Sequence, residues 1–228
     1  MKLFHPTHPY FINQKFGGNA EYYSKHVPGL MGHSGIDLMA TRGQPIYASH
    51  DGLAILGVDD KEGYGVVIRS NEKLKYKDSE TFIKTIYWHL LPEGRRSGQV
   101  KQGEIIGYAD NTGLSMGDHL HFALKPQAQN EDDDSWFNIE QKNGYFGNID
   151  PEPHLDFYFY RDLKKGANSI DVFYLQKRLG VTPTWYYGPK TQAAVFDFQI
   201  KNLTLSWYER YILKGSIVGP KTRKALNA

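Results

Sequence analysis

The stretch "GLSMGDHLHFAL", residues 113–124, contains the triplet His119-Leu120-His121, and Phe122 and Leu124 follow it. In a β-strand, alternate residues point to the same face of the sheet. His119 and His121 would then share one face, with Leu120 and Phe122 on the other. The pattern predicts a strand that buries an apolar face in the core and presents two imidazoles on its opposite face.

Short apolar segments separated by glycine surround this strand on its N-terminal side. They are rich in Val, Ile, Tyr, Phe and Trp and too short to form independent helices, which favours β-structure. An Asp51-Gly52 turn signal between two such runs predicts a hairpin over residues 44–58. The further strands that we expect cover residues 64–70, 82–90 and 119–124. The first part of the chain is therefore predicted to be a mostly antiparallel β domain.

After residue 163 the apolar residues recur at helical spacing. In residues 168–180, an Asn168/Ser169 cap precedes Val172, Leu175 and Leu179, and Gly180 gives a stop signal. The motif Gly-Pro-Lys-Thr opens a second segment at residue 188 and returns 31 residues later at residue 219, with proline where a first helical turn favours it. These patterns predict a small all-α domain of about three helices.

The predicted boundaries follow from a change in composition. The segment 125–157 is polar, acidic and proline-bearing, so we expect the β domain to cover residues 1–155, a linker residues 156–162, and the helical domain residues 163–228. The acidic run 131–134 lacks the alternating ligand spacing of a calcium loop and is interpreted as a solvated loop.

The absence of cysteine excludes disulfides and thiolate metal sites, so His, Asp or Glu must hold any tightly bound metal. Charge is unevenly spread. From Asp156 onward there are 12 Lys and Arg against 5 Asp and Glu, a net charge of +7, whereas the preceding part carries −5. A basic C-terminal part indicates an anionic partner, either nucleic acid or an anionic cell-wall polymer.

The N-terminal residues 1–16 lack the apolar core of a secretory signal, and no apolar run approaches the roughly 18 residues of a membrane span. We therefore expect a soluble chain without a Sec-type signal.

Two imidazoles and a carboxylate could form a metal site. In "GHSGIDL", residues 32–38, Gly35 between His33 and Asp37 would let the backbone turn so that both side chains point at one centre. Together with the 119–121 triplet, these residues contain the ingredients of a zinc site with two imidazoles and one carboxylate, which is the ligand count of a catalytic site that keeps one position open. The histidines outside the motifs receive no catalytic role: His5, His8, His26, His50 and His154.

Three segments in order, "GHSGIDLMATRGQPIYASHDG", "YWHL" and "GEIIGYADNTGLSMGDHLHFAL", resemble the motif series of the lysostaphin-like (LytM-type) peptidoglycan endopeptidases. That resemblance implies one zinc ion per chain, held by His33, Asp37 and His121. It implies that His89 and His119 handle protons and the oxyanion while a zinc-activated water attacks a peptide carbonyl. The residue before His119 is commonly proline in that family. Here it is Asp118, which we interpret as a surface or turn residue, with a role in tuning a neighbouring imidazole as the alternative.

Tyr22 and Tyr23 precede the first motif and are candidates to line a substrate groove or contact the oxyanion, although the sequence does not place them.

Residues 163–228 resemble the small helical peptidoglycan-binding domain found on many wall hydrolases. The resemblance is carried by "LKKGANSIDVFYLQKRLGV", "YYGPKTQAAVFDFQIKN" and "SIVGPKTRKALN". The stretch 203–215 is longer and more aromatic than the link usual in that domain.

Taken together, the resemblances imply a zinc metalloendopeptidase that is anchored to peptidoglycan and acts as a monomer without a nucleic-acid or membrane partner. A phage-type endolysin is the preferred context, held in the host cytoplasm until it is released to the wall. The alternative is an exported bacterial hydrolase that remodels the wall from an extracellular position. A non-catalytic regulator on the same fold and a nucleic-acid-binding basic module are less favoured. The first would lose ligands that are retained here, and the second would gather its charges on one recognition helix.

Overall fold

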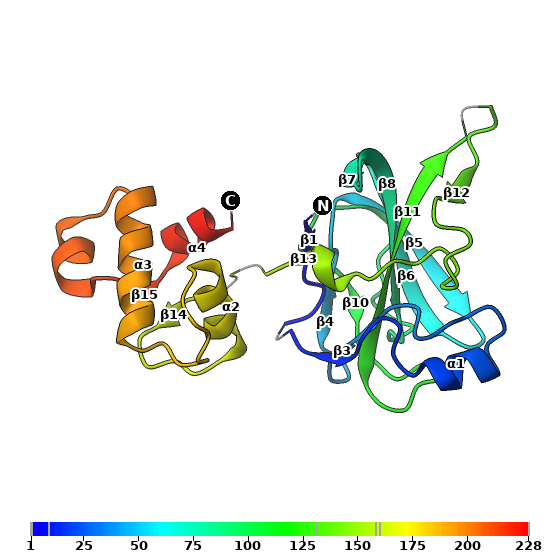
Figure 1. Ribbon diagram of the computed structural model, residues 1–228, viewed down its shortest axis with the longest axis horizontal. Coiled ribbons are helices and arrows are strands. Elements are labelled where there is room, and N and C mark those ends of the chain that lie inside the picture. The colour runs from blue at the N-terminus through cyan, green and yellow to red at the C-terminus, as the bar shows by residue number, and fades with distance from the viewer. Residues whose placement is uncertain (1, 9, 131, 158, 160, 228) are drawn as a thin grey trace. The chain divides into compact units, whose positions relative to one another are not determined.

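The computed structural model describes residues 2–8, 10–130, 132–157, 159 and 161–227. The chain folds into two compact units, Met1–Asp156 and Phe157–Ala228 (Figure 1). No helix among the described residues combines the length and the apolar character that a membrane crossing requires.

The first unit is built on a nine-stranded antiparallel sheet (Figure 1). Seven strands follow one another across it in the order β2-β3-β11-β8-β6-β5-β9, while β7 pairs with β8 and β12 with β11. The bounds are β2 Ile12–Gln14, β3 Ile36–Met39, β5 Gly52–Asp59, β6 Gly63–Ser70, β7 Leu74–Tyr76, β8 Ser79–Trp88, β9 Gly98–Val100, β11 His119–Gln129 and β12 Trp136–Asn138. The prediction of a mostly antiparallel β domain is confirmed.

Smaller elements complete this unit. A parallel pair joins β1 (Leu3–Phe4) to β13 (Leu155–Asp156), and an antiparallel pair joins β4 (Pro45–Tyr47) to β10 (Ile105–Tyr108). The helix α1 covers Ala20–His26, and a 3₁₀ turn, η1, covers Glu152–His154.

The long strand β11 has two chemically different faces. Leu120, Phe122 and Leu124 are fully buried on its core side, as the alternation of the sequence predicts. The strand also runs five residues beyond the predicted end at residue 124, because residues 121–127 stay in register with β8. His119 and His121 are therefore placed at the N-terminal end of a strand that crosses much of the sheet.

The predicted hairpin over residues 44–58 is wrong. The two runs form strands, but β4 pairs with β10 and β5 pairs with β6 and β9. Gly52 explains the difference, since a Cβ at this position would meet the carbonyl oxygen of Arg69 at 2.2 Å. The glycine permits close approach to β6 rather than a tight turn between β4 and β5.

In the second unit, the predicted helices are present as α2 (Ile170–Arg178), α3 (Pro189–Asn202) and α4 (Pro220–Leu226). The hydroxyl of Ser169 accepts from the backbone N–H of Val172, as expected of the N-cap. The unit is not purely helical, because β14 (Leu163–Lys164) pairs with β15 (Ile217–Val218). Within the aromatic stretch 203–215, residues Glu209–Leu213 form a π-helical turn, η2.

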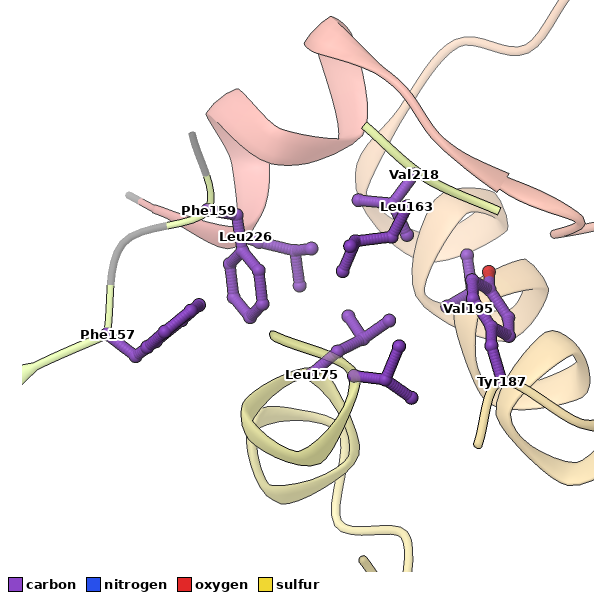
Figure 2. Close-up of a cluster of buried hydrophobic side chains, with 9 residues drawn as sticks. Phe157, Phe159, Leu163, Leu175, Tyr187, Val195, Val218 and Leu226 are labelled. Atoms are coloured by element: carbon purple, nitrogen blue, oxygen red, sulfur yellow. The ribbon is translucent and has the colours of Figure 1, made fainter. Parts of the chain in front are cut away.

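The core of the second unit gathers side chains from all three helices and both short strands, as Figure 2 shows. Phe157 and Phe159, which the sequence assigned to the linker, are 6% and 2% exposed and belong to this core. Aromatic burial therefore places the start of the unit at residue 157 rather than 163.

The sequence repeat corresponds to a repeated contact. Gly188 and Gly219 cap α3 and α4 with nearly the same backbone angles, and the threonine three residues later is buried in both. The amide of Gln176 donates to the hydroxyl of Thr191 at 2.8 Å, and the amide of Gln199 donates to that of Thr222 at 2.9 Å. Each helix is thus tied to the preceding one by the same glutamine–threonine hydrogen bond.

If the two units unfold independently, core truncations will act on separate transitions. Leu175→Ala removes a fully buried side chain from the second unit and is expected to destabilise it by about 3 kcal/mol through lost burial and a residual cavity. Ile68→Ala is the matched change in the first unit. In scanning calorimetry, each substitution should lower one transition and leave the other in place. A single transition lowered by both would show that the chain unfolds as one cooperative unit.

Candidate metal and catalytic site

A buried cluster of two histidines and one aspartate lies where β3 meets β11. The register places Asp37 of β3 directly opposite His121 of β11, and neighbours of this kind point to the same face of the sheet. His33 reaches the same point from the loop before β3, where its backbone N–H donates to the carbonyl of Gly18.

The three side chains converge on one point. Nε2 of His33 lies 2.9 Å from Nδ1 of His121, and both nitrogens lie 3.1 Å from Oδ1 of Asp37. His33 and His121 are buried, and the carboxylate is mostly so. Among the described residues, this is the one group of three or more His or acidic side chains with donor atoms close enough to share a metal ion.

The protonation states of the cluster suit a cation. Nδ1 of His33 lies 3.3 Å from the carbonyl oxygen of Lys15, so a proton on Nδ1 leaves a lone pair on Nε2. Burial disfavours the charged form of Asp37, but the adjacent imidazoles of His121 and His33 outweigh burial and hold the pKa of this carboxyl well below the usual range. An ionised carboxylate and the Nε2 lone pair of His33 therefore point at one centre, beside Nδ1 of His121.

The spacing fits a tetrahedral metal. Zinc–nitrogen bonds of about 2.0–2.1 Å would place neighbouring ligands about 3.3 Å apart, and the three separations here are 2.9–3.1 Å. Three protein ligands leave a fourth position open, which is the arrangement of a catalytic zinc site rather than a closed structural one.

Gly35 is needed here for a reason that the sequence did not reveal. A Cβ at this position would meet the carbonyl oxygen of Phe122 at 2.6 Å and the ring of His121 at 2.8 Å. The residue does not adopt a positive φ, so the glycine serves close packing against β11 rather than a turn.

Two further histidines lie beside the cluster. His119 is the first residue of β11 and on the same face as His121, and its Nε2 lies 3.5 Å from Oδ1 of Asp37. His89 follows the end of β8, and its ring centroid is 4.6 Å from that of His119 and 6.1 Å from that of His121. All five predicted site residues therefore come together; the roles assigned to them stay a prediction.

Backbone carbonyls fix the orientation of both rings. Nδ1 of His89 lies 2.8 Å from the carbonyl oxygen of Thr112, and Nδ1 of His119 lies 2.8 Å from that of Gly117. A proton on each Nδ1 leaves Nε2 unprotonated and able to accept a proton. Burial, and then the neighbouring His119, lower the pKa of His89 to about 4, so the ring is neutral at pH 7.

His89 also has a left-handed backbone, with φ of 62°, although only 4% of the residue is exposed. Histidine tolerates this region better than most residues but still prefers negative φ. The surrounding bonds hold it there, since Asp110 N–H donates to the carbonyl of His89 at 2.8 Å.

Tyr23 is a site neighbour that the sequence could not place. Its ring centroid lies 5.6 Å from that of His33, and burial, followed by the negative charge of Asp37, raises the pKa of its hydroxyl to about 12. Tyr22 is 59% exposed and stacks on His26 instead. Nothing in the sequence separates these adjacent tyrosines, because only the docking of α1 decides which one faces the cluster.

Neither Asp118 nor the described part of the acidic loop belongs to the group His33, Asp37 and His121. Oδ2 of Asp118 accepts from the backbone N–H of Arg42 at 3.1 Å, and the residue is exposed. This contact agrees with a surface role. Of the predicted acidic loop 131–134, Glu131 lies outside the described residues, and Asp132, Asp133 and Asp134 are exposed between β11 and β12.

The five other histidines lie outside this constellation. His50, for example, is buried in the first unit, where Nδ1 lies 2.9 Å from the carbonyl oxygen of Asp51 and Nε2 lies 2.9 Å from the hydroxyl of Thr85.

Residues 31–133 match the family model described as Peptidase family M23. This range contains all five clustered residues, and the match supports an M23 catalytic domain in this part of the chain. The matched residues make up less than half of the chain, and none of them belongs to the second unit.

Curated relatives match the same part of the chain. The DD-carboxypeptidase/endopeptidase Mpg of Neisseria meningitidis is 35% identical over 97 residues, which cover 42% of this chain and 21% of that protein. The peptidoglycan DD-endopeptidase ShyC of Vibrio cholerae is 36% identical over 95 residues, covering 41% and 20%. The chain thus spans about a fifth of the length of these relatives. The catalytic domain of lysostaphin from Staphylococcus simulans aligns at a TM-score of 0.44 and 23% identity, over 63% of this chain and 90% of that one.

Gly35→Ala tests the close packing behind the cluster. The added methyl group would meet a strand carbonyl that cannot move freely, so we expect His121 to be displaced and bound zinc to fall from about one equivalent to a small fraction. Elemental analysis after dialysis measures the zinc content. Gly219→Ala, where the nearest atom lies 3.9 Å from the added carbon, is the matched glycine control and should keep its zinc. Full zinc content in Gly35→Ala would contradict the packing argument.

Proposed function

We propose that this chain is a zinc-dependent peptidoglycan endopeptidase of the M23 type, which hydrolyses peptide bonds in the stem peptide or cross-bridge of bacterial cell walls. The observation that carries the proposal is the convergence of His33, Asp37 and His121 on one centre, with two further imidazoles beside it. The family match and the names of the relatives, which describe peptidoglycan endopeptidases, support the substrate class.

His33, Asp37 and His121 are the residues that would hold the metal. When bound there, zinc would supply Lewis-acid polarisation of the scissile carbonyl and lower the pKa of a water molecule toward neutrality. The anionic Asp37 offsets part of the charge of a dication, and burial of the two imidazoles limits competition from bulk water.

His89 and His119 would move the protons. Each ring is oriented by a backbone carbonyl at Nδ1, which leaves Nε2 as the atom that exchanges a proton. In this tautomer a neutral ring accepts a proton at Nε2 but donates none from it, so either histidine is suited to take the proton of the attacking water. Once protonated, the same Nε2 can donate to the tetrahedral oxyanion or to the leaving amine. The same imidazole can therefore act first as the base and then as the proton donor.

The second unit is proposed to bind the cell wall. Its three helices, the repeated Gly-Pro-Lys-Thr motif and its net positive charge support a module that meets an anionic wall polymer. On this proposal the biological context is a phage-type endolysin. A bacterial enzyme that remodels the wall is the second context, favoured by the names of the Neisseria and Vibrio relatives.

Chelation tests the hydrolytic proposal. Digestion of purified peptidoglycan should release new amino termini detectable by mass spectrometry, and a chelator or His121→Ala should reduce the rate at least about 10²-fold, because the polarising cation is lost. His154→Ala is the matched histidine control, since His154 lies beside Tyr76 and outside the cluster, and should retain activity. New reducing ends instead of amino termini would identify a glycosidase. Activity unaffected by chelation would exclude the metal mechanism.

Removal of the second unit tests the binding proposal. A chain ending at Asp156 should lose most of its binding to insoluble peptidoglycan in a pelleting assay and still cleave short soluble peptides, because the whole cluster lies in the first unit. Equal binding of the truncated and full chains would refute a wall-binding role for residues 157–228. Loss of soluble-peptide cleavage would show that the first unit depends on the second.

A further inference from the structure

Three cationic side chains lie in a row across the central strands of the sheet. The register pairs Arg69 of β6 with Lys84 of β8, and Lys84 with Lys125 of β11. Residues directly opposite each other in antiparallel strands point to the same face, and like charges in this arrangement destabilise the sheet. The stability of the fold therefore does not explain why three cationic side chains lie side by side, and binding of an anion would.

No acidic group among the described residues neutralises this row. The ion pairs found in that part of the chain include none with Arg69, Lys84 or Lys125. Nε of Arg69 donates to the side-chain oxygen of Gln127 at 3.3 Å, and Nζ of Lys125 donates to the carbonyl of Phe146 at 2.8 Å. Both acceptors are neutral, so the positive charge remains available to a ligand.

The pKa shifts agree with this description. Burial, followed by the charge of Arg69, lowers the pKa of Lys84. Burial and then the charge of Lys84 lower the pKa of Lys125 to about 8. In both cases the neighbouring charge that contributes is another cation. A bound anion would offset this repulsion between like charges.

Two members of the row, Arg69 and Lys84, border an open cavity of about 520 Å³. Arg69, Lys84 and Gln127 line it from the sheet, and Trp136 and Asn138 of β12 line it from the side. The guanidinium of Arg69 lies over the ring of Trp136 at 4.1 Å, which restrains its orientation, and the amide of Gln127 donates to Asn138 at 2.9 Å. These contacts hold the polar groups of the cavity in defined positions.

The cavity lies on the same face of the sheet as the metal cluster. Residues 121, 123, 125 and 127 of β11 alternate with the buried core residues, so Lys125 and Gln127 point to the side of His121. Lys125 is four residues from His121, a distance of about 13–14 Å along a strand. Ala123 and Ile86 lie between them, opposite each other in the register, and both are buried, so the direct path along the strands is covered. A peptide that reached both places would have to pass over this covered segment, so it would need at least about four extended residues.

We infer that the row Arg69, Lys84 and Lys125, together with Trp136, is a specificity subsite that binds a carboxylate of the peptide substrate at least about four residues from the scissile bond. This inference rests on the proposed function, because the metal cluster defines where the scissile bond lies. A carboxylate fits because it accepts hydrogen bonds from the guanidinium and ammonium groups together. It can belong to an acidic side chain or to the free C-terminus of the peptide.

Binding to the full chain in the presence of a chelator tests the subsite independently of hydrolysis. The probes are blocked hexapeptides that carry either one Glu or one Gln at the same position, and a third peptide with a free C-terminal carboxylate. Calorimetry should show about tenfold tighter binding of an acidic peptide than of the Gln peptide. Comparison of the two acidic peptides shows which source of the carboxylate is preferred: the Glu side chain if the Glu peptide binds more tightly, or the chain terminus if the peptide with a free C-terminus does.

Single substitutions then show which residues cause the preference for the acidic peptide. Lys84→Gln and Arg69→Gln should abolish the preference for the acidic peptide, whereas Lys101→Gln, the same charge change at an exposed residue paired with Asp51, should keep it. Lys84→Gln should also raise the melting midpoint by about 2 °C, since it removes the middle one of three like charges. This rise would show that the lost preference does not reflect misfolding.

Three results would overturn the inference: a preference that persists in Lys84→Gln, equal affinity for all three peptides, or tighter binding of inorganic phosphate than of the acidic peptide. The last would assign the row to a phosphate-bearing polymer. A preserved carboxylate preference without any peptidoglycan cleavage would instead refute the proposed function and leave the subsite in place.

Discussion

The antiparallel pairing of β3 with β11 is the constraint on which the site depends. Their register sets Asp37 opposite His121, and the alternation along β11 then fixes which side chains face the core and which face the metal cluster. A slip of one residue would turn His119 and His121 into the core and expose Leu120 and Phe122. The fully buried Leu120, Phe122 and Leu124 make that slip costly, so the hydrophobic core and the candidate metal site enforce the same register.

The site also requires close packing against its rings and strands, and glycines without a Cβ permit it at two places. Gly35 lets the loop before β3 lie against His121, while Gly57 and Gly65 face each other across β5 and β6 beneath the indole of Trp88. A Cβ at Gly65 would lie 2.1 Å from that ring. Trp88 is itself opposite His121 in the register, so these glycines allow a flat aromatic surface to extend from the cluster across neighbouring strands.

Sequence patterns predicted those features of the molecule that depend on residues close together in the chain. The period-two triplet 119–121 predicted the strand and the shared face of its histidines, and the caps and helical spacing after residue 168 predicted α2. The pairing of β4 with β10, the docking of Tyr23 beside His33 and the core position of Phe157 were not predictable in this way. Each depends on contacts between segments distant in sequence, which neither periodicity nor turn residues encode. The same holds for the cationic row, whose three members become neighbours only through the register of β6, β8 and β11.

The left-handed backbone of His89 has a consequence for how this fold balances stability against activity. A non-glycine residue in this conformation costs roughly 1 kcal/mol relative to glycine, and here the residue that bears the cost is an imidazole beside the metal cluster. Glycine at position 89 would relax the backbone while removing the imidazole, so a substitution there mixes two effects of opposite sign on the native state. Because the imidazole is buried and Nδ1 lies 2.8 Å from the carbonyl oxygen of Thr112, the packing lost on truncation outweighs the backbone relief, so the ring that the proposed chemistry needs also stabilises the conformation that it occupies.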